Sequence, residues 1–100
     1  MQYRHGDVMI EEIAELPTGQ KRKLPHRTLA HGEVTGHRHQ IREVNGSTLY
    51  EMPTHLLLEV TDEFVTLVHE EHKPIQLKRG FYKIWRQREY SPEEIRTIRD

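Results

Sequence analysis

The chain contains no cysteine, and this absence excludes disulfide bonds, thiolate nucleophiles and zinc–thiolate sites together. Any metal ion would therefore be held by nitrogen and oxygen ligands. No apolar run approaches the length of a membrane span, and the N-terminus lacks the apolar region of a signal peptide, so we expect a cytoplasmic protein. An excess of one charge is also absent, because 15 lysines and arginines stand against 16 aspartates and glutamates. The overall charge thus indicates neither nucleic acid nor a membrane as a partner.

One hundred residues, 34% of them apolar, suffice for one small domain that spans residues 1–100. Short segments rich in β-branched residues alternate with glycine and proline, which is typical of an all-β fold, either a small antiparallel barrel or a jelly-roll-like sandwich. The expected strands are residues 6–13, 26–30, 37–44, 47–52, 55–60, 64–69, 75–77 and 81–88. Turns are expected at residues 61–63 and 78–80. Ser91 and Pro92 have the residue types of a helix start, so a short C-terminal helix is expected over residues 92–99.

Eight histidines are many for this length, and His37 and His39 lie one residue apart. Because alternate side chains of a strand point to the same face, both histidines should share a face with Ile41 and Glu43. A neutral imidazole on an apolar face is costly when it has no partner. Three potential ligands on one such face favour a metal site.

The Asn45-Gly46 pair is a strong signal for a type I′ turn. We therefore expect residues 47–52 to fold back on residues 37–44, with Tyr50 opposite Ile41. Tyr50 would then project beside the candidate site, where it could donate a proton or fill the core.

The segment around His37 resembles the first motif of the cupin superfamily, in which a glycine precedes two histidines one residue apart and a glutamate follows. Gly32, His37, His39 and Glu43 match this motif, with one residue fewer after the glycine. The second motif of the family has no clear match. The resemblance implies a small jelly-roll barrel and a metal ion held by His37, His39, Glu43 and a fourth histidine from a later strand.

Two later histidines are candidates for the fourth ligand. His69 ends an expected strand on its apolar face, and His72 follows closely. Nitrogen and oxygen ligands of this kind suit Zn, Mn, Fe(II) or Ni. Glu43 could be a ligand, could orient a histidine, or could act as a general base.

The remaining histidines give less evidence for a metal site. His5, His26 and His55 have no partner in the sequence and are expected to be structural or exposed. His31 has the strand parity of His37, but the glycines between them break the phase. A metal-free alternative also stays open, in which His37 and His39 join a polar network with Thr48, Tyr50 and backbone groups.

Three functions fit these observations. The first is a metal-binding protein, either an enzyme or a sensor, that acts on a small molecule. The second is a non-catalytic module for RNA or a protein partner, because cations and aromatic rings lie near one another. Its residues are Lys21, Arg22, Lys23, Arg38, Arg42, Tyr82, Trp85, Arg86, Arg88 and Tyr90. The third is a metal-free hydrolase or nuclease that uses histidines as acid and base.

A small domain with a long strand edge also favours a homodimer.

Overall fold

The computed structural model describes residues 2–31 and 36–86 of the chain. These residues form eight strands and no helix, so none of them belongs to a helix that could cross a membrane. The strands are β1 (Gln2–His5), β2 (Val8–Ile13), β3 (Arg22–Lys23), β4 (Thr28–His31), β5 (Arg38–Ile41), β6 (Ser47–Glu51), β7 (Leu56–His69) and β8 (His72–Arg86). The helix expected over residues 92–99 lies outside the described residues.

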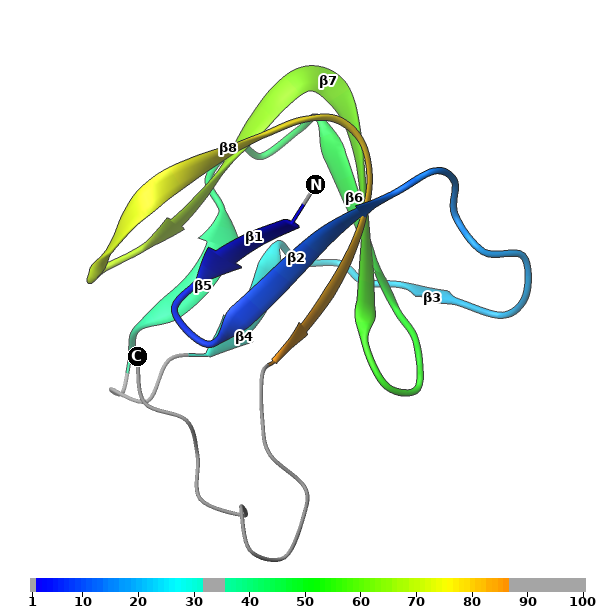
Figure 1. Ribbon diagram of the computed structural model, residues 1–100, viewed down its shortest axis with the longest axis horizontal. Coiled ribbons are helices and arrows are strands. Elements are labelled where there is room, and N and C mark those ends of the chain that lie inside the picture. The colour runs from blue at the N-terminus through cyan, green and yellow to red at the C-terminus, as the bar shows by residue number, and fades with distance from the viewer. Residues whose placement is uncertain (1, 32–35, 87–100) are drawn as a thin grey trace, which may run out of the picture.

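All strand pairs are antiparallel, and the strands belong to one sheet with the order β1-β2-β8-β7-β5-β4. Strand β6 pairs with the first half of β7 and carries β3 on its other edge. The sheet curls into a half-barrel, as Figure 1 shows. The sequence prediction of a small, all-β, barrel-like domain is therefore confirmed.

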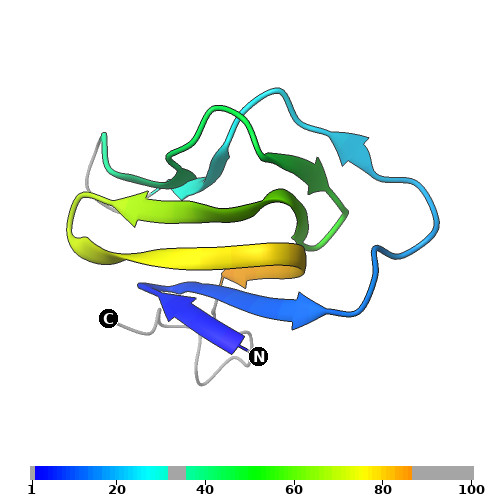
Figure 2. The same ribbon diagram turned by 90° about the horizontal axis from the view of Figure 1, so that it is seen from above.

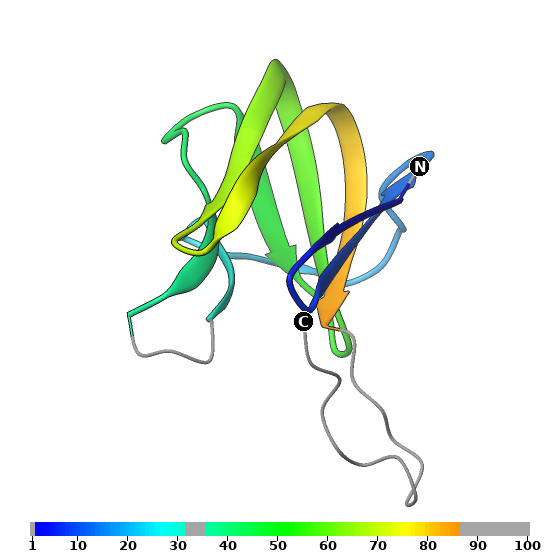
Figure 3. The same ribbon diagram turned by 60° about the vertical axis from the view of Figure 1, so that its left-hand side comes forward.

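Strands β7 and β8 form one long hairpin that runs through the middle of the sheet (Figure 2). The turns expected at residues 61–63 and 78–80 are wrong, because both segments lie within this hairpin. Val60 pairs with Gly80 and Phe64 with Lys78, so residues 61–63 oppose a single residue and form a bulge. Gly80 has a φ of 151°, which favours glycine. Polar and glycine residues thus bend the hairpin here instead of ending it (Figure 3).

The hairpin expected between residues 37–44 and 47–52 is also wrong. Strand β5 pairs with β4 and with the second half of β7, whereas β6 pairs with the first half of β7. The Gly46 carbonyl accepts hydrogen bonds from the amides of Thr61 and Asp62, at 2.8 and 3.2 Å. The Asn45-Gly46 turn therefore contacts the bulge of β7. The turn signal predicted that residues 37–44 and 47–52 pair with each other, but both β5 and β6 pair with the long strand β7 instead.

Apolar side chains from six of the strands form one core. Its buried members are Val8, Ile10, Leu29, Ile41, Leu49, Leu58, Val60, Val65, Leu67, Leu77, Tyr82 and Ile84. On β5, Arg38 is exposed whereas His39 and Ile41 are buried. The alternation predicted from the sequence is thus present, and it turns His39 inward.

Glu43 ties the segment after β5 to β7. One carboxylate oxygen accepts the Thr66 backbone amide at 2.7 Å and the other accepts the Thr66 hydroxyl at 2.8 Å. Thr66 is buried, so both groups need these partners. The carboxylate thereby stabilises the chain in this region.

Replacing Glu43 by Ala should destabilise the fold by about 1.5–3 kcal/mol, because two charge-assisted hydrogen bonds are lost and a buried amide loses its acceptor. Urea unfolding of both proteins measures this difference. The conservative Glu43→Gln variant, which keeps one acceptor oxygen, should lose less. Equal stability of wild type and Glu43→Ala would contradict this role.

Candidate metal centre

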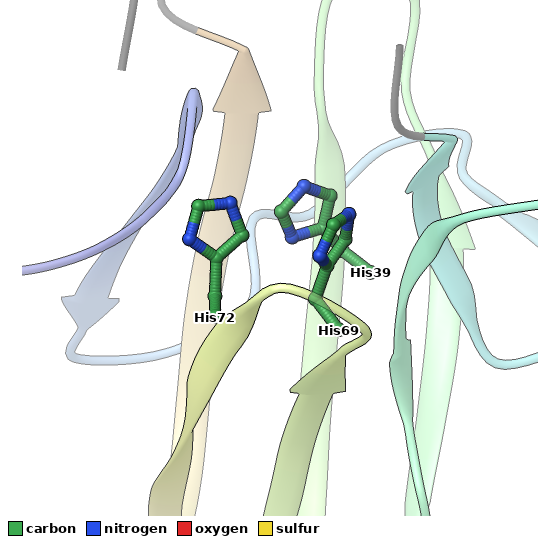
Figure 4. Close-up of side chains that lie close together, drawn as sticks. All are labelled: His39, His69 and His72. Atoms are coloured by element: carbon green, nitrogen blue, oxygen red, sulfur yellow. The ribbon is translucent and has the colours of Figure 1, made fainter. Parts of the chain in front are cut away.

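Five histidines from three separate parts of the chain gather at one end of the sheet. His69 and His72 flank the tip of the β7–β8 hairpin, His5 ends β1, and His37 and His39 lie at the start of β5. The ring centroids of His39 and His69 are 4.3 Å apart, and those of His69 and His72 are 4.7 Å apart. Figure 4 shows these three rings gathered at the hairpin tip. The structure therefore brings together the four histidines that sequence analysis selected, and it adds His5.

The tip of the β7–β8 hairpin is a two-residue connection, Glu70-Glu71. His69 pairs directly with His72 across it. Opposed residues of an antiparallel pair place their side chains on the same face. The short turn therefore fixes two imidazoles side by side and leaves two carboxylates outside them.

A second two-residue turn, Gly6-Asp7, positions His5. His5 pairs with Val8, and Gly6 has a φ of 66°, which fits the first central position of a type II′ turn. A Cβ atom on Gly6 would lie 2.8 Å from the His72 Nε2 atom, so the glycine also lets β1 approach the cluster. The expectation that His5 is merely structural or exposed missed its place in the cluster. The sequence analysis placed Gly6 and Asp7 in an expected strand over residues 6–13, although a Gly-Asp pair is also a signal for a two-residue hairpin turn. Nothing in the sequence indicated that β2 would pair with β8.

Hydrogen bonds assign the protons on His5 and His39. The His5 Nε2 atom is 3.0 Å from the Lys73 carbonyl oxygen, which can only accept, so Nε2 carries the hydrogen. The Nδ1 atoms of His5 and His39 are 2.8 Å apart. In a neutral pair, His5 Nδ1 must accept and His39 Nδ1 must donate. The unshared lone pair of His39 is therefore on Nε2.

A carboxylate faces this lone pair. The Asp7 Oδ1 atom is 3.9 Å from the His39 Nε2 atom, while Asp7 Oδ2 accepts from Arg86 Nε and Nη2 at 3.0 and 2.7 Å. A lone pair and a carboxylate oxygen repel each other unless a cation or proton lies near both. The arrangement thus attracts positive charge to the Nε2 side of His39.

Burial favours the neutral form of three histidines of the cluster, His5, His39 and His69. Burial, followed by the neighbouring charges of His69 and His5, lowers the pKa of His39 to about 3. Burial is also the largest cause that lowers the pKa of His5 and of His69. Neutral imidazoles are the form that binds metal ions.

Two groups of side chains converge closely enough to hold a metal ion. In the first, one ring nitrogen from each of His39, His69 and His72 lies within 4.8 Å of the others. Neighbouring ligands of a tetrahedral ion with bonds of about 2.1 Å lie about 3.4 Å apart, so nitrogens at the outer limit of 4.8 Å would have to move about 1.4 Å closer to bind one ion. The second group consists of His37, His69 and Glu70.

Two predicted site residues lie elsewhere. Both carboxylate oxygens of Glu43 are used by Thr66, and neither of the two groups contains Glu43. The Tyr50 hydroxyl donates to Glu59 at 3.5 Å, and the Lys21 ammonium lies 5.7 Å from the Tyr50 ring centroid. The two differences have separate reasons. Tyr50 lies on β6, which pairs with the first half of β7, whereas β5 pairs with the second half. Glu43 lies beyond the end of β5, and Thr66 holds its carboxylate.

The metal-free protein should lose stability as the pH falls from about 6.5 to 5. A histidine with a pKa of about 3 in the folded state and an ordinary pKa of 6.5 when unfolded takes up its proton only on unfolding. Stability is therefore fully present above pH 6.5 and decreases below it by up to about 1.4 kcal/mol per pH unit for each such histidine. Urea unfolding in the presence of a chelator measures this slope. A flat profile would contradict the burial of neutral histidines.

Replacing Gly6 by Ala should weaken metal uptake more than it weakens the fold. The new methyl group would meet His72 at 2.8 Å and would require a positive φ, at a cost of about 1 kcal/mol or more. Gly19, which also has a positive φ but has no atom within 4 Å of an added Cβ, supplies the matched control as Gly19→Ala. Metal titration and urea unfolding of both variants separate the two effects. Equal metal affinity in both variants would contradict the close approach of Gly6 to His72.

The chain matches a known protein family. A family model described as a domain of unknown function (DUF8820) matches residues 4–87. No curated protein and no solved structure matches the chain. The matched range includes all five clustered histidines as well as Asp7 and Arg86. Since it covers most of the sequence, the chain belongs to the DUF8820 family.

Proposed function

We propose that this protein binds one divalent transition metal ion through His39, His69 and His72, which we call the inner set. The observation that carries the proposal is the convergence of three ring nitrogens within 4.8 Å of one another, in a cluster whose buried histidines are held neutral. His5 supports the inner set from behind. The His5 Nδ1 atom accepts a hydrogen bond from His39 Nδ1, and the His5 Nε2 atom donates to the Lys73 carbonyl. Outer partners orient metal-binding histidines in this way.

A purely polar network explains the cluster less well. Thr48 pairs with Glu59, and Tyr50 donates to the same glutamate, so neither satisfies a histidine. Among the described residues, His37 Nδ1 is buried and has no hydrogen-bond partner. Each neutral imidazole carries one donor and one lone pair. The lone pair on His39 Nε2 faces the Asp7 carboxylate, and this pairing of two acceptors favours a cation between them.

The ligand chemistry narrows the choice of metal. Imidazole ligands suit Zn, Fe and Ni, whereas Mn prefers a larger share of oxygen. Three nitrogen ligands therefore place Zn, Fe(II) and Ni ahead of Mn. Three protein ligands also leave coordination positions open, and a bound ion would supply Lewis acidity toward a small molecule. This supports either a metal-dependent enzyme or a sensor of a small ligand.

The cupin resemblance remains part of this proposal. The half-barrel fold and the inward-facing His39 support it. The ligand set departs from the family pattern, because Glu43 bonds to Thr66. The carboxylate that lies beside His39 is that of Asp7. It comes from the β1–β2 turn, whereas the glutamate of the cupin motif follows the histidines on the same strand.

The two other functions have weaker support. A general base works best when its pKa lies near the working pH, and the pKa of His39, about 3, is far below it. For an RNA-binding face, Tyr82 is buried and its hydroxyl donates to the Lys78 carbonyl, so it offers no ring for stacking. Arg86 is paired with Asp7 and Arg22 with Glu51. Arg88 and Tyr90 lie outside the described residues. A homodimer remains a prediction.

Elemental analysis of protein purified without an affinity tag or chelator tests the proposal. The wild-type protein should contain, or take up from a Zn, Fe(II) or Ni solution, close to one ion per chain. The His39→Ala/His72→Ala variant should lose this ion. His26→Ala is the matched control, because His26 is exposed and outside the cluster, and it should bind metal like the wild type.

Two results would overturn the proposal. One is a folded wild-type protein that binds none of the three ions. The other is metal binding that persists unchanged in the His39→Ala/His72→Ala variant.

A further inference from the structure

A second group of ligands lies outside the inner set and shares one residue with it. His37, Glu70 and Glu71 line the outer side of the hairpin tip, and together with the shared His69 we call them the outer set. The His37 and His69 ring centroids are 5.6 Å apart, and the His69 and His39 centroids are 4.3 Å apart. His69 is therefore a member of both sets.

The outer set contains a nitrogen and an oxygen placed like two ligands of one ion. His37 Nδ1 lies 3.4 Å from Glu71 Oε2, yet it has no hydrogen-bond partner among the described residues. Two ligands of a tetrahedral ion with bonds of about 2.0–2.1 Å lie about 3.4 Å apart. The separation therefore suits a shared cation better than it suits a hydrogen bond.

Glu70 provides a second carboxylate that is already oriented. Its Oε1 atom accepts the Arg38 backbone amide at 3.1 Å, which holds the side chain toward the start of β5. The ligand atoms of Glu70, His37 and His69 all lie within 4.8 Å of one another. The outer set thus combines imidazole and carboxylate, whereas the inner set consists of imidazoles only.

The two sets differ in their access to solvent. The Glu71 side chain is 61% exposed and that of His37 is 24% exposed, whereas His39 is only 2% exposed. An ion from solution therefore meets the carboxylates of the turn before it meets His39. Paired negative charges at an exposed turn also raise the local concentration of divalent cations.

His69 connects the two sets and is not free in the absence of metal. Its Nδ1 atom accepts the Glu71 backbone amide at 3.0 Å, so this lone pair becomes available only when the turn moves. A cation held by the side chains of Glu70 and Glu71 acts on the same two-residue turn. Binding at the outer set can thus release His69 for the inner set.

We propose that the outer set is a loading position, where a divalent metal ion binds first and from which it passes through His69 to the inner set. Because His69 belongs to both positions, the chain holds one ion at a time. This inference rests on the proposed function, since it requires that the inner set binds metal.

Rapid-mixing kinetics with Zn²⁺ test the inference. Loading is followed by the decrease of free zinc with a chromophoric chelator, and release is followed by transfer to excess chelator. Glu70→Gln/Glu71→Gln and His37→Ala should each slow loading and release by at least tenfold and leave the equilibrium affinity within about threefold of wild type. Glu63→Gln, an exposed glutamate on the bulge of β7, is the matched control and should load at the wild-type rate.

The dependence of the rate on ionic strength gives a second readout. Loading of the wild type should slow as salt is added, because the carboxylates attract the ion through solution. This dependence should be much smaller in Glu70→Gln/Glu71→Gln and unchanged in Glu63→Gln.

Three results would overturn the inference and leave the proposed function intact. They are loading rates that equal the wild type in both outer-set variants, an affinity that falls tenfold at an unchanged loading rate, and two zinc ions bound per wild-type chain. A wild-type chain that binds no zinc, iron or nickel would instead overturn the proposed function itself.

Discussion

The arrangement of the histidine cluster depends on the contact between His5 and His39. Two buried imidazoles meet through their Nδ1 atoms at 2.8 Å, and the Lys73 carbonyl fixes the proton of the first. Since one imidazole must then donate to the other, the Nε2 lone pair of His39 is left to face Asp7 and the rings of the hairpin tip. A fold that buries neutral imidazoles in this way loses stability in acid, and it gains stability from any cation that the lone pairs can share.

Two tight turns make this contact possible. The Gly6-Asp7 turn presents His5 and Asp7, and the Glu70-Glu71 turn presents His69 and His72. The bulge at residues 61–63 bends the long β7–β8 hairpin (Figures 1 and 3). At its tip, His72 lies close to His5 of β1 and His69 lies close to His39 of β5. The Asp7–Arg86 ion pair connects the first turn to the last residue of β8. The three residues of the inner set, His39, His69 and His72, thereby lie on strands rather than on loops.

The sequence was sufficient to predict the all-β class and the inward face of His39, because strand periodicity is a local property. It also indicated His69 and His72, whose rings lie close to that of His39. It was not sufficient for strand partners. The Asn45-Gly46 signal favoured a local hairpin, but β7 is long enough to pair with β5 and β6 at once, and this tertiary pairing places Tyr50 away from the histidines. Glu43 lies beyond the end of β5 and bonds to Thr66 instead. His5 was missed for the same reason, since its neighbours are set by the pairing of β2 with β8. The register between strands that are far apart in the sequence decides which side chains meet. This register cannot be predicted from residue propensities or from the spacing of residues.

Nitrogen-detected NMR of the imidazole rings, before and after the addition of Zn²⁺, tests the central claim most directly. In the metal-free protein at pH 7, His5 should carry its proton on Nε2 and His39 on Nδ1. Zinc should shift the resonance of His39 Nε2 together with one ring nitrogen of His69 and one of His72, and should leave the His5 nitrogens nearly unchanged. A proton on Nε2 of metal-free His39, or a zinc-dependent shift at His5 Nδ1 in place of His39 Nε2, would contradict the account.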